Sequence, residues 1–180
     1  SGTSTNMNAN EVIAARAIEL LGGARGDKSL VHPNDHVNMG QSTNDVFPTA
    51  IHVAAMGAVE THAVPAMRQL AEAFHVKSNE FEAVVKAGRT HLQDAVPVTL
   101  GQEFSGYESV IRHGVARIEA TRSHLSELAI GGTALGTGLN AHPEFAARVT
   151  TELRTLTGHL FRRAANAFEA MQNRDACVEL

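Results

Sequence analysis

A run of apolar residues at a spacing of seven is the feature that most limits how this chain can fold. The repeating row consists of Phe104, Ile111, Ile118 and Leu125. Thr99 and Gln102 precede this run and match a capping box, the pair of side chains that closes the first turn of a helix. The pattern predicts one helix of about 43 Å, packed nearly parallel to its neighbours, and the small Gly114 beside the row predicts close helix contact.

A helix of that length cannot be buried by the rest of a 180-residue chain, so it needs partner helices from a bundle, completed by other subunits. Aromatic residues make up only 4% of the chain and Trp is absent, which favours close-packed helices over a β-sandwich. We therefore expect an all-α fold in which this chain supplies an incomplete long-helix bundle.

The remaining helices are predicted from caps and breaks. Residues 1–10 are polar and predict a loop, with Asn8 capping a helix that stops at Gly22. A helical pattern from Pro48 to Val85 is expected to kink or break at Pro65. The segment GRTHLQDAVP then interrupts the helices. Two more helices are expected, one from Pro143 to Gly158 and one from Asn166 that is still running at Leu180, so the chain looks truncated.

Composition excludes several classes of function. A net charge of −4 with both signs interspersed does not suit binding to nucleic acid. No apolar run is long enough to span a membrane. The single cysteine, Cys177, suits a reducing, cytoplasmic location.

Three polar segments, SGTSTNMN, GQSTND and GRTH, bring hydroxyl and amide groups close to expected helix starts. Helix N-termini bind carboxylates and phosphates, and neutral side-chain donors would hold a small dianion there. The alternative is that these residues only cap helices and form turns. The candidate donors are Thr3, Ser42, Thr43, Asn44 and Thr90.

Two charged residues accompany the third segment. His91 in GRTH can act as an acid or base, or donate to a carboxylate, although it can equally be a surface residue. Arg89 either binds an anion or pairs with Asp94 or Asp45.

Metal and nucleotide sites have little support. His32 and His36 are four residues apart, but Pro33 between them argues against two ligands on one helix face. The glycine-rich GGTALGTGLN lacks the Lys-Ser/Thr of a phosphate-binding loop and follows no strand, so we expect a loop between helices.

At these same segments the chain resembles the aspartase/fumarase superfamily over its whole length. The matching stretches are GTSTNMNANEV, HVNMGQSTNDVFPTA, GRTHLQDAVPVTLGQEF and GGTALGTGLNAHPE. The resemblance implies a homotetramer whose central bundle gathers long helices from four subunits, with each active site built from three chains. It also implies elimination of a group β to a carboxylate, without metal or organic cofactor, to release fumarate through an aci-carboxylate intermediate.

The resemblance assigns roles by position. Thr3 is similar to the threonine of the family's first substrate loop, and Ser1 and Asn6 are weaker candidates on that loop. Ser42, Thr43 and Asn44 resemble the carboxylate-binding trio. Thr90 and His91 resemble the catalytic pair that reaches a neighbouring subunit's substrate. Residues 1–44 would then hold substrate loops and the end of an N-terminal region, and residues 45–180 part of the central bundle, in one partial domain.

One family motif is missing from these residues. The base of the family is a serine in a loop of the form GSSxMPxKxNP, and no such segment occurs in this chain. We therefore expect the chain to be inactive alone. GRTHLQDAVP and AMQN favour aspartate ammonia-lyase, with fumarate hydratase as the alternative. A non-catalytic helical assembly fragment is the hypothesis of another class.

Overall fold

The computed structural model describes all residues from 1 to 180 and is mostly helical. The chain divides into two compact units, each described here by itself. The first unit combines residues 1–56 with residues 123–179, and residues 57–122 with Leu180 form the second. The expected division at residue 44 within one partial domain stays a prediction. No helix is both long enough and apolar enough to cross a membrane.

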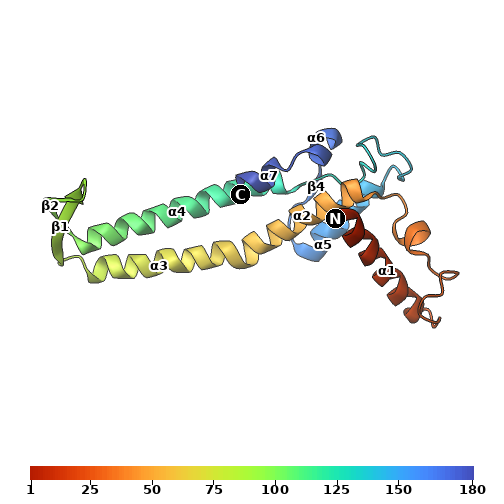
Figure 1. Ribbon diagram of the computed structural model, residues 1–180, viewed down its shortest axis with the longest axis horizontal. Coiled ribbons are helices and arrows are strands. Elements are labelled where there is room, and N and C mark those ends of the chain that lie inside the picture. The colour runs from red at the N-terminus through yellow and green to blue at the C-terminus, as the bar shows by residue number, and fades with distance from the viewer. The chain divides into compact units, whose positions relative to one another are not determined.

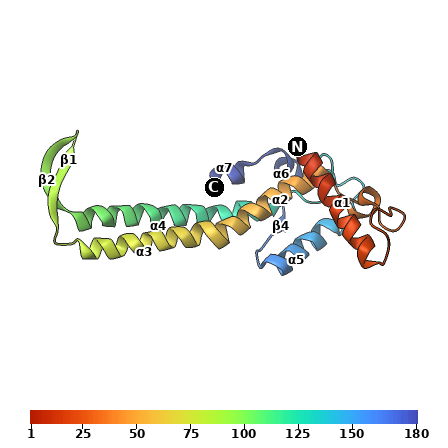
Figure 2. The same cartoon turned by 60° about the horizontal axis from the view of Figure 1, so that its bottom comes forward.

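The second unit is built on two long helices, α3 (Val64–Glu80) and α4 (Leu100–Leu125), which run side by side in Figures 1 and 2. The predicted capping box is present, because the Thr99 N–H donates to Gln102 Oε1 at 3.0 Å and the Gln102 N–H donates to Thr99 Oγ1 at 3.1 Å. The long helix expected from the heptad spacing is thus confirmed. The expected break near Pro65 is confirmed too, because a π-helical turn, η2 (Val59–Ala63), ends just before it.

Phe104, the first heptad residue of α4, packs against aromatic residues of the α3 end. The Phe104 ring lies 5.9 Å from that of Phe74 and 5.6 Å from that of Phe81. A Cβ on Gly114 would lie 3.0 Å from Met67 Cε, so the glycine allows the close contact that its small size predicts. The buried core farther along this helix pair consists of Val59, Val64 and Val115.

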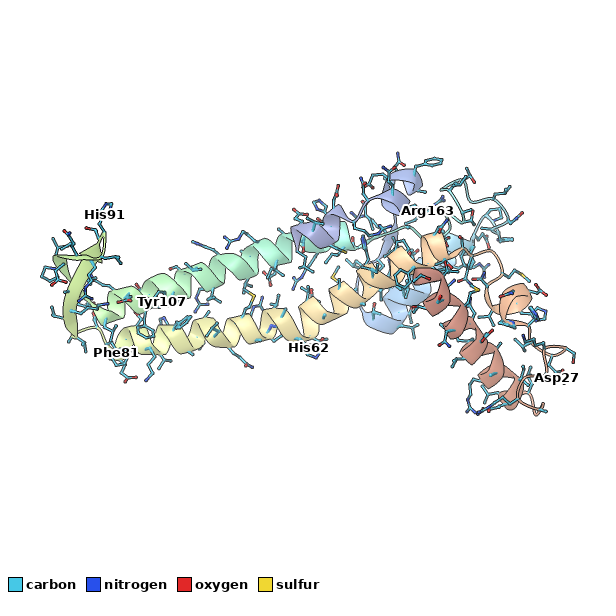
Figure 3. The ribbon with its side chains drawn as sticks, in the orientation of Figure 1. Asp27, His62, Phe81, His91, Tyr107 and Arg163 are labelled. Atoms are coloured by element: carbon cyan, nitrogen blue, oxygen red, sulfur yellow. The ribbon has the colours of Figure 1, made fainter.

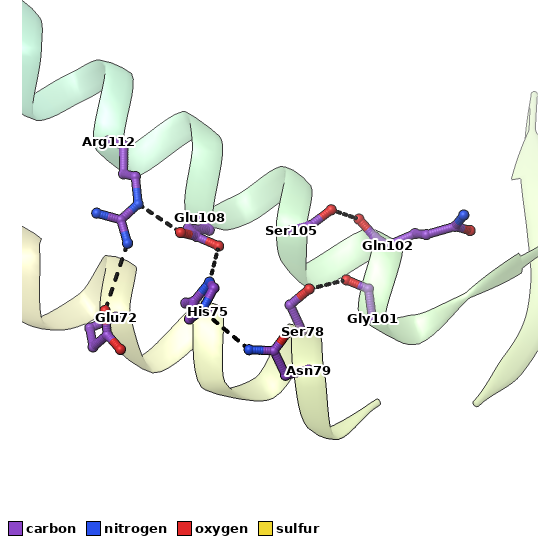
Figure 4. A network of polar contacts seen from close by, with 9 residues as sticks. All are labelled: Glu72, His75, Ser78, Asn79, Gly101, Gln102, Ser105, Glu108 and Arg112. Atoms are coloured by element: carbon purple, nitrogen blue, oxygen red, sulfur yellow. Dashed lines mark hydrogen bonds and ion pairs between the residues drawn. The ribbon is translucent and has the colours of Figure 1, made fainter. Parts of the chain in front are cut away.

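Polar contacts also connect the two helices (Figure 4). The Glu108 carboxylate accepts a hydrogen bond from Arg112 Nε at 2.7 Å and lies 3.1 Å from His75 Nδ1. His75 Nε2 in turn lies 3.2 Å from Asn79 Nδ2. The hydrogen bond from Arg112, together with that from His75, holds the pKa of Glu108 below its usual value.

The segment expected only to interrupt the helices forms an antiparallel hairpin of β1 (Val85–Thr90) and β2 (Gln93–Thr99). Its β-branched residues favour extended backbone once Phe81 has ended α3. A Cβ on Gly88 would lie 2.6 Å from the Val96 carbonyl oxygen, so only glycine fits at this irregularity in the strand pairing. The fold is therefore mostly helical, as expected, with a hairpin that the sequence-based prediction did not contain.

The first unit gathers shorter elements around one core. A short parallel pair joins Glu127–Leu128 of β3 to Arg162–Arg163 of β4. The buried core residues are Met56, Leu125, Leu128, Ile130 and Phe161. The helices of this unit are α1 (Gly2–Leu20), the π-helical η1 (Pro33–Val37), α2 (Thr43–Ala58), α5 (Phe145–Thr157), α6 (Ala167–Gln172) and α7 (Asp175–Glu179).

The prediction of a loop over residues 1–10 is wrong, because α1 begins at Gly2 with Ser1 as its cap. The polar residues that suggested a loop pack against other polar groups. Asn6 Nδ2 donates to Thr43 Oγ1 at 3.1 Å, and Asn10 Nδ2 donates to Asn38 Oδ1 at 3.1 Å.

The last helical stretch is also shorter than expected. Asn166 caps α6 as predicted, accepting from the N–H groups of Phe168 and Glu169. The helix ends at Gln172, however, and does not continue to Leu180. The Arg174 guanidinium donates to the carbonyls of the preceding turn and so satisfies groups that a continuing helix would use.

Candidate functional site

A cavity of about 540 Å³ in the first unit brings together segments that are far apart in the sequence. The starts of α1 and α2 meet the glycine-rich loop and α6 there. No charged side chain lines this cavity, so it offers neutral donors and apolar surface. Its lining residues are Gly2, Thr3, Thr43, Asn44, Phe47, Pro48, Ala134, Leu135, Phe168, Met171 and Gln172.

Two helix N-termini supply its polar wall. Thr3 lies in the first turn of α1, and Thr43 and Asn44 lie in the first turn of α2. The first N–H groups of a helix have no partner within that helix, and they carry its partial positive charge. This arrangement suits an anion without requiring a cationic side chain.

The hydroxyl groups of Ser42 and Thr43 at the start of α2 accept hydrogen bonds within the chain, so their O–H groups can donate to a ligand. Thr43 Oγ1 accepts from Asn6, which leaves its own O–H free to donate to a ligand. Ser42 Oγ accepts from the Asn44 N–H at 3.2 Å, so Ser42 caps the helix and its O–H is likewise not used as a donor in that contact. Asn6 is buried and supports Thr43 instead of lining the cavity.

The opposite wall is the glycine-rich loop packed against α6. Asn44 Nδ2 donates to the Ala134 carbonyl at 2.9 Å. A Cβ on Gly132 would lie 2.5 Å from Met171 Sδ, and one on Gly136 would lie 2.8 Å from the Phe168 ring. The glycines therefore let the loop approach α6, a contact that no local pattern in the sequence indicates.

Asp45 contacts both the start of α2 and the glycine-rich loop, and the sequence did not predict these contacts. It is fully buried and does not line the cavity. Burial raises the pKa of the Asp45 carboxyl, while N–H donors from Ser42, Thr133 and Gly131 oppose that shift. Arg89 does not pair with Asp45; its Nε donates to Asp94 Oδ1 at 3.1 Å.

Two expected site residues lie in the second unit and do not line this cavity. Thr90 ends β1, and His91 and Leu92 form the two-residue turn of the hairpin (Figure 3). Their φ angles are +49° and +61°, a left-handed conformation that side chains other than glycine seldom adopt. His91 is exposed at this turn.

Ser1 does not line the cavity either, since its Oγ accepts from the Ser4 N–H at 3.4 Å and caps α1. The histidines considered as metal ligands have local partners. His32 Nδ1 accepts from the N–H of Asp35 at 3.2 Å, and His36 Nδ1 accepts from the N–H of His32 at 2.8 Å. No group of three or more His, Cys, Asp or Glu side chains is placed to hold a metal ion.

The chain matches one family model and several named proteins along its whole length. A family model described as lyase matches residues 1–180. The chain is 60% identical over 178 residues to a protein of Nitrosomonas europaea named fumarate hydratase class II, and 58% identical to one of the same name from Yersinia pestis. It covers 38% of the length of each of these relatives, and 99% of this chain is matched.

A solved structure supports the fold. The class II fumarase of Schistosoma mansoni superposes with a TM-score of 0.93 at 42% identity, over 99% of this chain and 40% of that one. The helical fold and the resemblance seen in the four motifs are both confirmed by these matches. The chain belongs to the lyase family of the aspartase/fumarase superfamily.

Proposed function

We propose that this chain forms part of the dicarboxylate site of a fumarate hydratase, which adds water to fumarate to give L-malate and removes it again. The observation that carries the proposal is a cavity of neutral donors at two helix N-termini, in a chain whose relatives are named fumarate hydratase. These relatives do not support the preference for aspartate ammonia-lyase drawn from GRTHLQDAVP and AMQN, and the alternative reading takes its place.

Thr3, Thr43 and Asn44 bind one carboxylate of the substrate in this proposal, with Ser42 beside them. Each supplies a hydroxyl, amide or backbone N–H donor near the start of a helix. Hydrogen bonds from such groups stabilise a carboxylate in the substrate. They stabilise the aci-carboxylate more strongly, because that intermediate carries additional negative charge.

Thr90 and His91 bind the second carboxylate in this proposal. The exposed turn that carries them leaves His91 accessible to another molecule. Because the family builds each site from three chains, we assign these residues to the cavity of a neighbouring subunit in a homotetramer. The imidazole then donates to the carboxylate that does not contact the α2 start.

Dehydration of L-malate breaks two bonds. A base removes the C3 proton, and the resulting electron pair is held on the neighbouring carboxylate as the aci-carboxylate. The C2–oxygen bond then breaks, and the hydroxide leaves with a proton as water, which gives fumarate. The serine that serves as base in the family has no counterpart in these residues, so we propose that the chain alone binds the dicarboxylate and does not convert it.

The test is fumarate formation, measured by ultraviolet absorbance, with L-malate and L-aspartate offered in parallel. The chain alone and a version extended to the length of its relatives are compared. The extended protein is expected to produce fumarate from L-malate only, and the chain alone from neither substrate. Production from L-aspartate would contradict the choice of water over ammonia. An extended protein that assembles but forms fumarate from neither substrate would favour the alternative of a non-catalytic helical assembly fragment, which is motivated by the missing serine motif.

A further inference from the structure

The Asp45 carboxylate connects the start of α2 to two backbone N–H groups of the glycine-rich loop. Its Oδ1 accepts from the Ser42 N–H at 2.9 Å. Its Oδ2 accepts from the N–H groups of Gly131 at 3.0 Å and Thr133 at 2.9 Å. One buried carboxylate therefore joins segments that lie 86 and 88 residues apart in the chain.

A second contact strengthens the same connection. The neighbouring Asn44 donates to the Ala134 carbonyl at 2.9 Å, so two successive residues of α2 hold the loop at two places. The loop backbone at Thr133 has a φ of +57°, which is unfavourable for a residue with a side chain. The hydrogen bond from its N–H to Asp45 helps to keep the loop in that conformation.

Asp45 itself is not placed to contact a substrate. Its exposed fraction is 0%, it does not line the cavity, and both oxygens are used by backbone donors. The three N–H groups that donate to the Asp45 carboxylate stabilise its negative charge, which reduces its repulsion of a dianion in the cavity.

We propose that Asp45 is a positioning residue that holds the donors Ser42–Asn44 and the glycine-rich loop at the spacing required to bind the dicarboxylate. This inference rests on the proposed function, because it assumes that the cavity between these segments is the substrate site. It assigns Asp45 no proton transfer and no contact with the substrate.

Asp45→Asn in the protein extended to the length of its relatives tests the proposal. The amide has one acceptor oxygen where the carboxylate has two, so either the contact with Ser42 or the contacts with the loop are lost. The donors bind the substrate carboxylate, so KM should rise when they are displaced, and they bind the aci-carboxylate more strongly, so kcat should fall as well. We expect KM for L-malate, and the inhibition constant of succinate, to rise about tenfold or more, together with a fall in kcat.

Asp27→Asn is the matched control. Asp27 Oδ1 also accepts from a backbone N–H, that of Ser29 at 3.1 Å, but this contact is local and exposed. KM should stay within about twofold of the unmodified protein. The proposal would be overturned by an Asp45→Asn protein that is folded at the assay temperature and has the same KM and succinate inhibition constant as the unmodified protein.

A measurement on the unmodified protein covers the case in which the variant does not fold. Saturating succinate should stabilise the arrangement that Asp45 holds and should therefore slow amide hydrogen exchange at Gly131 and Thr133 about fivefold. The N–H groups of these two residues donate to Asp45 and not to the ligand, so slower exchange there reports on the contact with Asp45. Unchanged exchange there would also overturn the proposal. If the unmodified protein forms no fumarate from L-malate, the proposed function fails, whereas the role of Asp45 is still decided by succinate binding and by this exchange.

Discussion

Replacing Leu92 with glycine should stabilise the hairpin that carries His91. Leu92 has a φ of +61° and follows His91 with +49°, so both residues of the turn are left-handed. A two-residue hairpin turn of this kind favours glycine or asparagine, because a Cβ is strained there. The Leu92 side chain is 97% exposed and loses no packing within the chain when it is removed.

The expected gain follows from two opposing effects. The left-handed conformation costs a residue with a side chain about 1–2 kcal/mol. Glycine costs about 0.5–1 kcal/mol more than other residues to order on folding. The difference leaves a net gain of about 0.5–1 kcal/mol, which corresponds to amide exchange about two- to fivefold slower in β1 and β2.

Hydrogen exchange of the chain measured residue by residue is the assay. Leu160→Gly is the control, because Leu160 is 78% exposed and is not among the residues with positive φ. That control should give no gain and should destabilise the chain slightly, since only the entropic cost of glycine remains. If Leu92→Gly exchanges as fast as the unmodified hairpin, or faster, the argument from backbone strain is refuted.

Three further predictions concern the site and the helix pair. Thr43→Val in the extended protein should raise KM for L-malate about tenfold, because valine cannot donate the hydrogen bond to the carboxylate, which contributes about 1.4 kcal/mol to binding. An unchanged KM would exclude Thr43 from binding. Phe104→Leu should lower the free energy of unfolding in urea by about 1.5–4 kcal/mol, because it removes three ring contacts; a loss below about 0.5 kcal/mol would show that these contacts contribute little. Because Arg112 and His75 lower the folded-state pKa of Glu108, its stabilising effect is present above its usual pKa of 4.5 and is lost as the pH falls through the lowered value. Glu108→Gln should therefore flatten the loss of urea resistance as the pH falls below about 4.5, and an equally steep loss would contradict this assignment.

Local patterns in the sequence predicted the parts of the fold that local interactions determine. The start and length of α4 follow from a capping box and a spacing of seven, which involve only neighbouring turns. Residues 1–10 show the limit of this reasoning. Their polarity suggested a loop, but Asn6 and Asn10 satisfy their amides on Thr43 and Asn38, so the first half of the helix is polar on its buried side.

The candidate site could be predicted only in part for the same reason. Thr3, Thr43 and Asn44 were expected because hydroxyls and amides near helix starts suit an anion, and all three line one cavity. Asp45 and Met171 were missed. Their importance depends on contacts with a glycine-rich loop that is distant in the sequence from Asp45, and spacing alone does not reveal such contacts.

A crystal structure of the extended protein with bound succinate tests the central claim most directly, because succinate carries both carboxylates and cannot react. The account predicts one carboxylate within hydrogen-bonding distance of Thr43, Asn44 and Thr3 in the cavity at the starts of α1 and α2. Succinate bound elsewhere, with this cavity empty at saturating concentration, would contradict it.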